Sequence, residues 1–179
     1  MTYDDRCDVG VCIHLDTNSI NARGKLEAVT QLEKWKANDV IMLEMAAAAH
    51  DEAFQGNSPA RQAKASDYIY NFDTHAPREQ ATRDQIEQVL FPGGAANQNQ
   101  RNDVEICFVA GRCMCWLVTL DGDSKSQPGG ILGNRDRLRE LGVEAMRPEE
   151  AVADIRKKIE VRDNNARFFA EKLGTPLPD

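Results

Sequence analysis

The sequence predicts an α/β fold: a three-layer α/β/α sandwich around a central, mostly parallel sheet of four to five strands. Short runs of apolar residues, several of them β-branched, alternate along the chain with segments in which apolar residues recur at helical spacing. The predicted strands are apolar at nearly every position, which is typical of strands that helices cover on both faces. A chain of 179 residues is long enough to bury this core as one domain.

The first third of the chain contains two predicted strands. Residues 8–15 form the first, and they stop at 16–19, a cluster of residues that favour helix N-caps. A helix is expected over 19–36, where five apolar residues recur at helical spacing: Ile20, Leu26, Val29, Leu32 and Trp35. Residues 38–43 are the second predicted strand, after an Asn-Asp turn, and 44–54 has the propensity of a helix.

The rest of the chain is predicted to add two strands and five helices. Residues 113–120 are the most strand-like segment, and 143–146 form a short fourth strand after Gly142, an expected helix C-cap. Pro148 opens the last helix, with two glutamates in its first turn. The other predicted helices are separated by polar or glycine-rich loops and lie over 60–70, 78–91, 102–112 and 131–141.

Charge and hydropathy exclude some classes of protein. The net charge of −7 is unfavourable for binding nucleic acid by bulk electrostatics, although bound cations would invert the local field. No apolar stretch approaches the roughly 20 residues of a membrane span. The N-terminus is acidic, unlike a signal or transit peptide. We therefore expect a cytoplasmic protein with no membrane partner.

The cysteines and histidines show no spacing typical of zinc sites. The cysteines are odd in number and include no CxxC pair, so we expect reduced, small core residues at Cys7, Cys12, Cys107, Cys113 and Cys115. His14 lies inside the first predicted strand and is expected to be a core or edge residue rather than a ligand. The other two histidines, His50 and His75, have no partner at metal-binding spacing.

Acidic residues stand where the predicted strands end. Asp16 follows the first strand and Glu44 the second. Asp121 follows the third, with Asp123 close behind. Because the carboxyl ends of parallel strands meet at one edge, with neighbouring strands about 4.8 Å apart, these side chains are expected to converge. Asp103 begins the helix that runs antiparallel into the third strand, so it is expected at the same edge.

A cluster of carboxylates is costly unless it binds a cation. Like charges so close repel by about 1 kcal/mol or more per pair, whereas oxygen ligands suit Mg²⁺ or Mn²⁺. One or two such ions can activate a water and neutralise charge growing on a phosphodiester. Each acid also has an ordinary explanation, as a helix cap, a first-turn acid or an exposed turn. Their joint placement at one edge favours the metal site.

Four segments of the chain resemble the motifs of PIN domains: "IHLDTNSI", "VIMLEMAAAAHDEA", "NDVEICFVAGRCMCWLVTLDGD" and "LRELGVEAMRPEEAV". The resemblance covers roughly residues 9–153. It implies a metal-dependent endonuclease that cuts single-stranded RNA, and many small PIN domains are toxins of toxin–antitoxin pairs. An antitoxin protein and a homodimer are therefore expected as partners. We expect residues 1–153 to form the PIN-like nuclease domain and 154–179 a helical extension of it.

The resemblance also implies roles for individual residues. The metal ligands and catalytic acids would be Asp16, Glu44, Asp103 and Asp121, with Asp123 as a further acid. Asn18 and Thr119 would orient the ligands or the attacking water. Glu52 could compete with Glu44 for its role.

Two arginines are candidates for binding RNA, and two other functions are compatible with the sequence. Arg135 and Arg139 share a face of the helix after the loop behind Asp121, where they would hold an RNA backbone if that face borders the acids; such a run is more often a solvated face. The first rival function is a catalytically silent PIN-like binding or scaffold module. The second is a phosphatase, which usually carries a DxD arrangement after the first strand, where this chain has "DTN".

Overall fold

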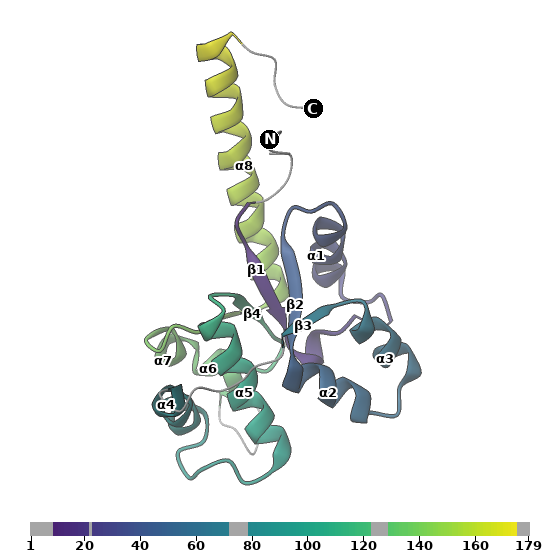
Figure 1. The fold of residues 1–179 in the computed structure, drawn as a ribbon, viewed down its shortest axis with the longest axis vertical. Helices are drawn as coiled ribbons and strands as arrows, with labels where there is room; N and C mark the ends of the chain where they lie inside the picture. The colour runs from purple at the N-terminus through teal and green to yellow at the C-terminus, as the bar shows by residue number, and fades with distance from the viewer. Residues whose placement is uncertain (1–8, 22, 72–78, 123–128, 175–179) are drawn as a thin grey trace.

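Five parallel strands form the centre of the molecule (Figure 1). The structure is a computed structural model that describes residues 9–21, 23–71, 79–122 and 129–174. The strands are β1 (Cys12–Leu15), β2 (Met42–Ala46), β3 (Ile69–Asn71), β4 (Trp116–Val118) and β5 (Glu144–Met146). Their order in the sheet is β3-β2-β1-β4-β5, and every neighbouring pair is parallel. The predicted α/β class with a parallel central sheet is confirmed.

Helices cover both faces of this sheet. They are η1 (Thr17–Ser19, a 3₁₀ turn), α1 (Glu27–Ala37), α2 (Ala47–Gln55), α3 (Pro59–Ser66), α4 (Gln80–Leu90), α5 (Gln98–Arg112), α6 (Gly130–Gly133), α7 (Arg135–Arg139) and α8 (Pro148–Leu173). On one face α1 packs against α8, and on the other α5 packs against α2 and α4 (Figure 1). The result is a three-layer α/β/α sandwich.

The order of the strands creates a switch point between β1 and β4. The chain builds outward from β1 through β2 to β3, and then returns to the other side of β1 to build β4 and β5. Loops that leave β1 and β4 therefore turn in opposite directions, and ligands of open α/β sheets bind in the crevice that this creates. The side chains of Ile13, Leu15 and Leu117 are fully buried, and each burial stabilises the fold by about 1.5–3 kcal/mol.

Two boundaries differ from the prediction in the first half of the chain. β2 continues to Ala46, so Glu44 lies inside the strand and does not open the following helix. α1 begins at Glu27 because the side chain of Asn21 holds the preceding segment in a loop. Its Oδ1 accepts a hydrogen bond from the Leu26 N–H (3.0 Å), and its Nδ2 donates to the Leu26 carbonyl (3.1 Å).

Two further differences concern strands. Residues 69–71 were expected to end or follow a helix but form β3, a strand too short for periodicity to reveal. The strand expected over 113–120 is confined to Trp116–Val118, because Met114 turns the chain in a left-handed conformation (φ 55°) after α5. Both differences shorten or shift elements without changing the order of the sheet.

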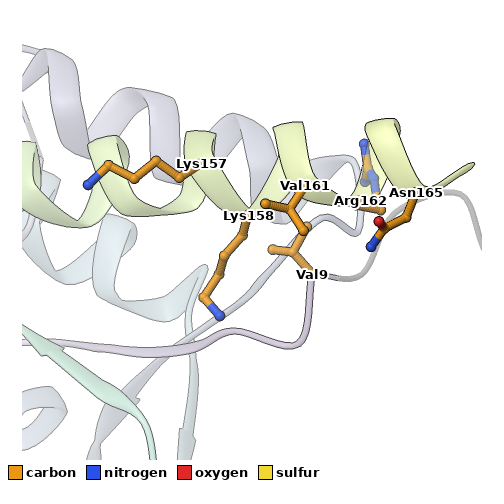
Figure 2. A pocket seen from close by; sticks show the side chains of 6 residues that line it. All are labelled: Val9, Lys157, Lys158, Val161, Arg162 and Asn165. Atoms are coloured by element: carbon orange, nitrogen blue, oxygen red, sulfur yellow. The ribbon is translucent and has the colours of Figure 1, made fainter. Parts of the chain in front are cut away.

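The last helix, α8, is 26 residues long and runs without interruption across the expected boundary between residues 153 and 154, where the helical extension was expected to begin. Its second half projects from the body of the molecule (Figure 1). Where it leaves the body, Val161 and Val9 point toward one another in a shallow groove (Figure 2). The rest of this groove is lined by α8 itself, through Lys157, Lys158, Arg162 and Asn165. Among the described helices, none has the length and apolar character needed to cross a membrane.

Candidate metal centre

The carboxyl ends of β1 and β4 carry the first two acids of the site. Asp16 follows β1 directly, and its N–H donates to the Val118 carbonyl (3.0 Å), which extends the β1–β4 pairing by one residue. The Thr119 N–H donates to the Met146 carbonyl (3.1 Å) and extends the β4–β5 pairing in the same way. The backbone at both strand ends is therefore held by the sheet, and Asp121 leaves it two residues after Thr119.

Asp16 is buried, with only 4% of its surface exposed, and two side chains donate to it. Thr119 Oγ1 and Asn18 Nδ2 each lie 2.6 Å from Asp16 Oδ2. Asn18 Oδ1 also accepts from the Leu120 N–H (2.9 Å), and Thr119 Oγ1 accepts from the Asp121 N–H (2.9 Å). Asn18 and Thr119, to which the PIN resemblance gave a role beside the expected ligands, thus connect Asp16 to the segment that carries Asp121.

A close backbone approach positions Asp121. Its Oδ2 accepts a hydrogen bond from the Ile131 N–H (2.9 Å), and its carbonyl accepts from the Leu132 N–H (2.9 Å). A Cβ at Gly130 would lie 2.8 Å from both carboxylate oxygens of Asp121, and Gly130 has a φ of +55°. Only glycine fits here, because any other residue would both collide with the carboxylate and adopt a strained backbone conformation.

Two helices bring further acids to the same place. Asp103 lies in the second turn of α5, and Glu52 lies in α2, where its Oε2 accepts from Thr17 Oγ1 (2.9 Å). The pKa of Asp103 is raised to about 8, first by burial and then by the charges of three neighbouring carboxylates: Asp16, Asp121 and Glu52. Burial likewise raises the pKa of Asp16 to about 6, opposed by the Thr119 hydrogen bond and reinforced by Glu52 and Asp121. The four carboxylates therefore share one electrostatic environment.

The structure does not bring Glu44 to this cluster. Glu44 is opposite His14 in the β1–β2 register, and its Oε2 lies 3.6 Å from His14 Nε2. The reason is the length of β2, which carries the chain two residues beyond Glu44 before α2 starts. Glu52 then occupies the place expected for Glu44, on the turn of α2 between the buried Ala49 and Ala53. The helical spacing of those alanines shows which face of α2 points inward and places Glu52 at its margin.

The other predicted residues lie in different surroundings. Arg135 is ion-paired with Glu150 (3.0 Å), and Arg139 with Glu144 (2.9 Å), so the structure shows both arginines on carboxylates rather than at the acid cluster. Asp123 is outside the described residues.

One arginine that was not predicted lies near the site. A Cβ at Gly122 would be 3.1 Å from Arg147 Nη2, which places this guanidinium beside the residue after Asp121. Arg147 directly follows β5, so it stands at the carboxyl edge of the sheet, as Asp16 does after β1. The same strand-end reasoning that located the acids could have found it.

The prediction that all cysteines are reduced is wrong for one pair. Cys12 and Cys115 form a disulfide, with Cα atoms 4.7 Å apart. The reason is the register of β1 and β4, which pairs Ile13 with Trp116 and so places the preceding residues, Cys12 and Cys115, side by side. Cys107 is a buried free thiol and Cys113 an exposed one. Cys7 and His75 lie outside the described residues.

The donor types at the acid cluster suit a hard cation, although no three of these described carboxylates have ligand oxygens within 4.8 Å of one another. Asp16, Glu52, Asp103 and Asp121 offer only carboxylate oxygens, the ligands that Mg²⁺ and Mn²⁺ prefer. Burial and the repulsion between carboxylates raise the pKa of Asp16 and Asp103, and a bound dication would offset both effects by favouring the ionised carboxylates. No protein-family model matches the chain, and neither does any curated protein sequence.

Proposed function

We propose that the chain is a PIN-like endoribonuclease that depends on Mg²⁺ or Mn²⁺ and hydrolyses phosphodiester bonds of single-stranded RNA. The observation that carries the proposal is the convergence of four carboxylates from four separate elements at the switch point of the sheet. Their mutual repulsion gives no stability to the fold, so a functional reason for the cluster is needed. Phosphodiester hydrolysis with metal ions is the chemistry that such oxygen sites support best.

The residues of the site would have distinct roles. Asp16, Asp103 and Asp121 would hold the ion, and Glu52, in place of Glu44, would complete the acidic ligands. A bound dication would supply an activated water and would neutralise charge on the phosphodiester. Thr119 and Asn18 orient Asp16 through the two 2.6 Å hydrogen bonds. Arg147, beside Gly122, offers a guanidinium for an RNA phosphate.

The acidic net charge of −7 is compatible with this substrate if the phosphates meet the ion and Arg147 locally. Binding would then depend on the metal more than on long-range attraction. An antitoxin partner and a homodimer belong to the same proposal, because they follow from the PIN resemblance alone. The cytoplasmic location expected from the sequence is compatible with it.

Cleavage of a labelled pool of single-stranded RNA tests the proposal. The wild-type chain is assayed with Mn²⁺, with Mg²⁺ and with EDTA, beside Asp16→Asn. Asp39→Asn is the matched control, because Asp39 is exposed in a turn with a φ of 54°, which Asn tolerates well. We expect metal-dependent cleavage that Asp39→Asn retains and Asp16→Asn loses.

Two results would contradict this proposal. Equal cleavage by Asp16→Asn and the wild type would place the active site elsewhere. Saturable Mn²⁺ binding at the acids without cleavage of RNA or DNA would instead favour the binding or scaffold module.

A further inference from the structure

A second group of potential ligands lies on β1, closer to its amino end than the acids. Side chains two residues apart in a strand point to the same face of the sheet, so Cys12 and His14 share a face. Cys115 is beside Cys12 across the β1–β4 pairing, and Glu44 is opposite His14 across the β1–β2 pairing. Cys12, His14 and Cys115 therefore bring two sulfurs and an imidazole to one place, and the carboxylate of Glu44 lies beside the imidazole.

These donors are close enough to share an ion. The sulfur atoms of Cys12 and Cys115 and a ring nitrogen of His14 all lie within 4.8 Å of one another. A tetrahedral Zn²⁺ site, with Zn–S near 2.3 Å and Zn–N near 2.0–2.1 Å, needs donor atoms about 3.4–3.8 Å apart. Small side-chain rotations suffice to reach this spacing once the sulfurs are no longer bonded to each other.

We propose that the reduced chain binds Zn²⁺ through the thiolates of Cys12 and Cys115 and the imidazole of His14. Glu44, whose Oε2 lies 3.6 Å from His14 Nε2, would orient the ring and raise its basicity, as carboxylates beside metal-binding histidines do. The site would be largely shielded from solvent, because His14 is fully buried and Cys115 is 3% exposed. Cys12 is half-buried and borders the exposed Met42, so an ion could enter from that side.

The oxidation state of the cysteines decides whether the site exists. A phosphine reductant transfers two electrons to the disulfide: the S–S bond breaks, two thiols form, and the phosphine takes oxygen from water to become a phosphine oxide. Zn²⁺ then displaces the two thiol protons, because only the thiolates are strong ligands. Disulfide and metal site are therefore alternative states of the same two sulfurs.

The two clusters are expected to bind different metal ions, because their ligand atoms differ. Thiolate and imidazole ligands select Zn²⁺, whereas the carboxylates beyond the end of β1 suit Mg²⁺ and Mn²⁺. His14 lies in β1, and Asp16 follows the end of β1 two residues later, about 7 Å away along an extended chain. The zinc site does not depend on the nuclease proposal, and its test needs no RNA.

Cobalt provides a direct readout, because Co²⁺ bound to thiolates in a tetrahedral site absorbs visible light and gives sulfur-to-metal charge-transfer bands. The full chain is reduced with a phosphine under anaerobic conditions and titrated with Co²⁺, and Zn²⁺ is then added. We expect one Co²⁺ to bind with these bands and Zn²⁺ to displace it. The oxidised chain should show neither band.

Variants assign the ligands. Cys12→Ser and Cys115→Ser should lose the charge-transfer bands and bind Co²⁺ at least about tenfold more weakly. Cys113→Ser, which removes an exposed free thiol close to the site in sequence, is the control and should behave as the wild type. Bands that persist in Cys115→Ser would overturn the assignment, and reduced wild-type chain without bands would overturn the proposal.

Alkylation gives a second test that requires no variant. Saturating Zn²⁺ should slow the reaction of Cys12 and Cys115 with iodoacetamide in the reduced wild-type chain, as mass spectrometry of its peptides would show, while Cys113 reacts at an unchanged rate. Equal protection of all three cysteines, or protection of none, would overturn the proposal.

Discussion

Replacing Asp103 by Asn should stabilise the protein in the absence of metal. Asn keeps the shape of the side chain and removes the charge that Asp16, Asp121 and Glu52 oppose. The pKa of Asp103 rises from its ordinary value of 3.8 to about 8 on folding. The folded chain therefore holds a proton that the unfolded chain releases, and stability falls as the pH rises from about 4 to about 8.

The magnitude follows from this shift. Each pH unit above 3.8 costs about 1.4 kcal/mol, which gives about 4 kcal/mol at pH 7 for a rigid site. Relaxation of the site and entry of water reduce this figure, so we expect Asp103→Asn to gain about 2–4 kcal/mol at pH 7. At pH 5 the gain in the free energy of unfolding should shrink to about 1 kcal/mol. The reason is that pH 5 lies only about one unit above the ordinary pKa of Asp103, so ionisation favours the unfolded chain much less.

Urea unfolding in EDTA at pH 5 and pH 7 measures the effect, with Asp39→Asn as the control for replacing an exposed acid. An Asp103→Asn variant that is no more stable than the wild type at pH 7 would refute the shared electrostatic environment. A gain that is equal at both pH values would show that it arises from something other than the shifted pKa. With saturating Mn²⁺ the order should reverse, because the ion stabilises the wild type through a ligand that the variant lacks.

Three other substitutions test the geometry of the site. Glu52→Gln should weaken Mn²⁺ binding, measured by calorimetry, by at least about tenfold. Glu44→Gln should change this affinity by no more than about twofold, since Glu44 faces His14. Equal effects of the two variants would mean that Glu52 is not the ligand. Gly130→Ala should lower the free energy of unfolding in urea by about 2–4 kcal/mol and weaken Mn²⁺ binding. Gly24→Ala is the control, because Gly24 has a φ of +63° and open space around its Cβ position. It should lower the free energy of unfolding by only about 1–2 kcal/mol. Thr119→Val removes a hydrogen bond that lowers the pKa of Asp16, so this pKa should rise above about 6. NMR titration of the Asp16 carboxyl carbon without metal would measure it. An unchanged or lower pKa would contradict the role of Thr119 as a hydrogen-bond donor to Asp16.

The parts of the site that could be predicted are those fixed by local sequence. Asp16 and Asp121 follow apolar runs directly, and a parallel sheet of such runs leaves little choice about where their ends meet. The sequence predicts Glu52 only as a competitor of Glu44, because its place depends on how far β2 continues before α2 begins. That boundary of two residues is one that propensity cannot resolve. Its alanine-rich surroundings are compatible with either structure.

Other features depended on pairing between distant segments. The disulfide of Cys12 and Cys115 requires the β1–β4 register, which no local pattern specifies when both strands are apolar on both faces. β3 has three residues and gains its stability from pairing with β2, so its sequence alone carries little signal. Arg147 is different, because it directly follows β5 and therefore stands at a strand end in the same way as the acids.

The scattering of the acids along the chain also has a kinetic consequence. Asp16, Glu52, Asp103 and Asp121 come from four elements, and they meet only after β4 has crossed back to lie beside β1. An unfolded or half-folded chain therefore offers no more than isolated carboxylates, with little affinity for a divalent ion. If the β1–β4 pairing forms after the rate-limiting step of folding, the ion will slow unfolding and leave the folding rate nearly unchanged. Metal would then prolong the lifetime of the finished molecule without guiding its assembly.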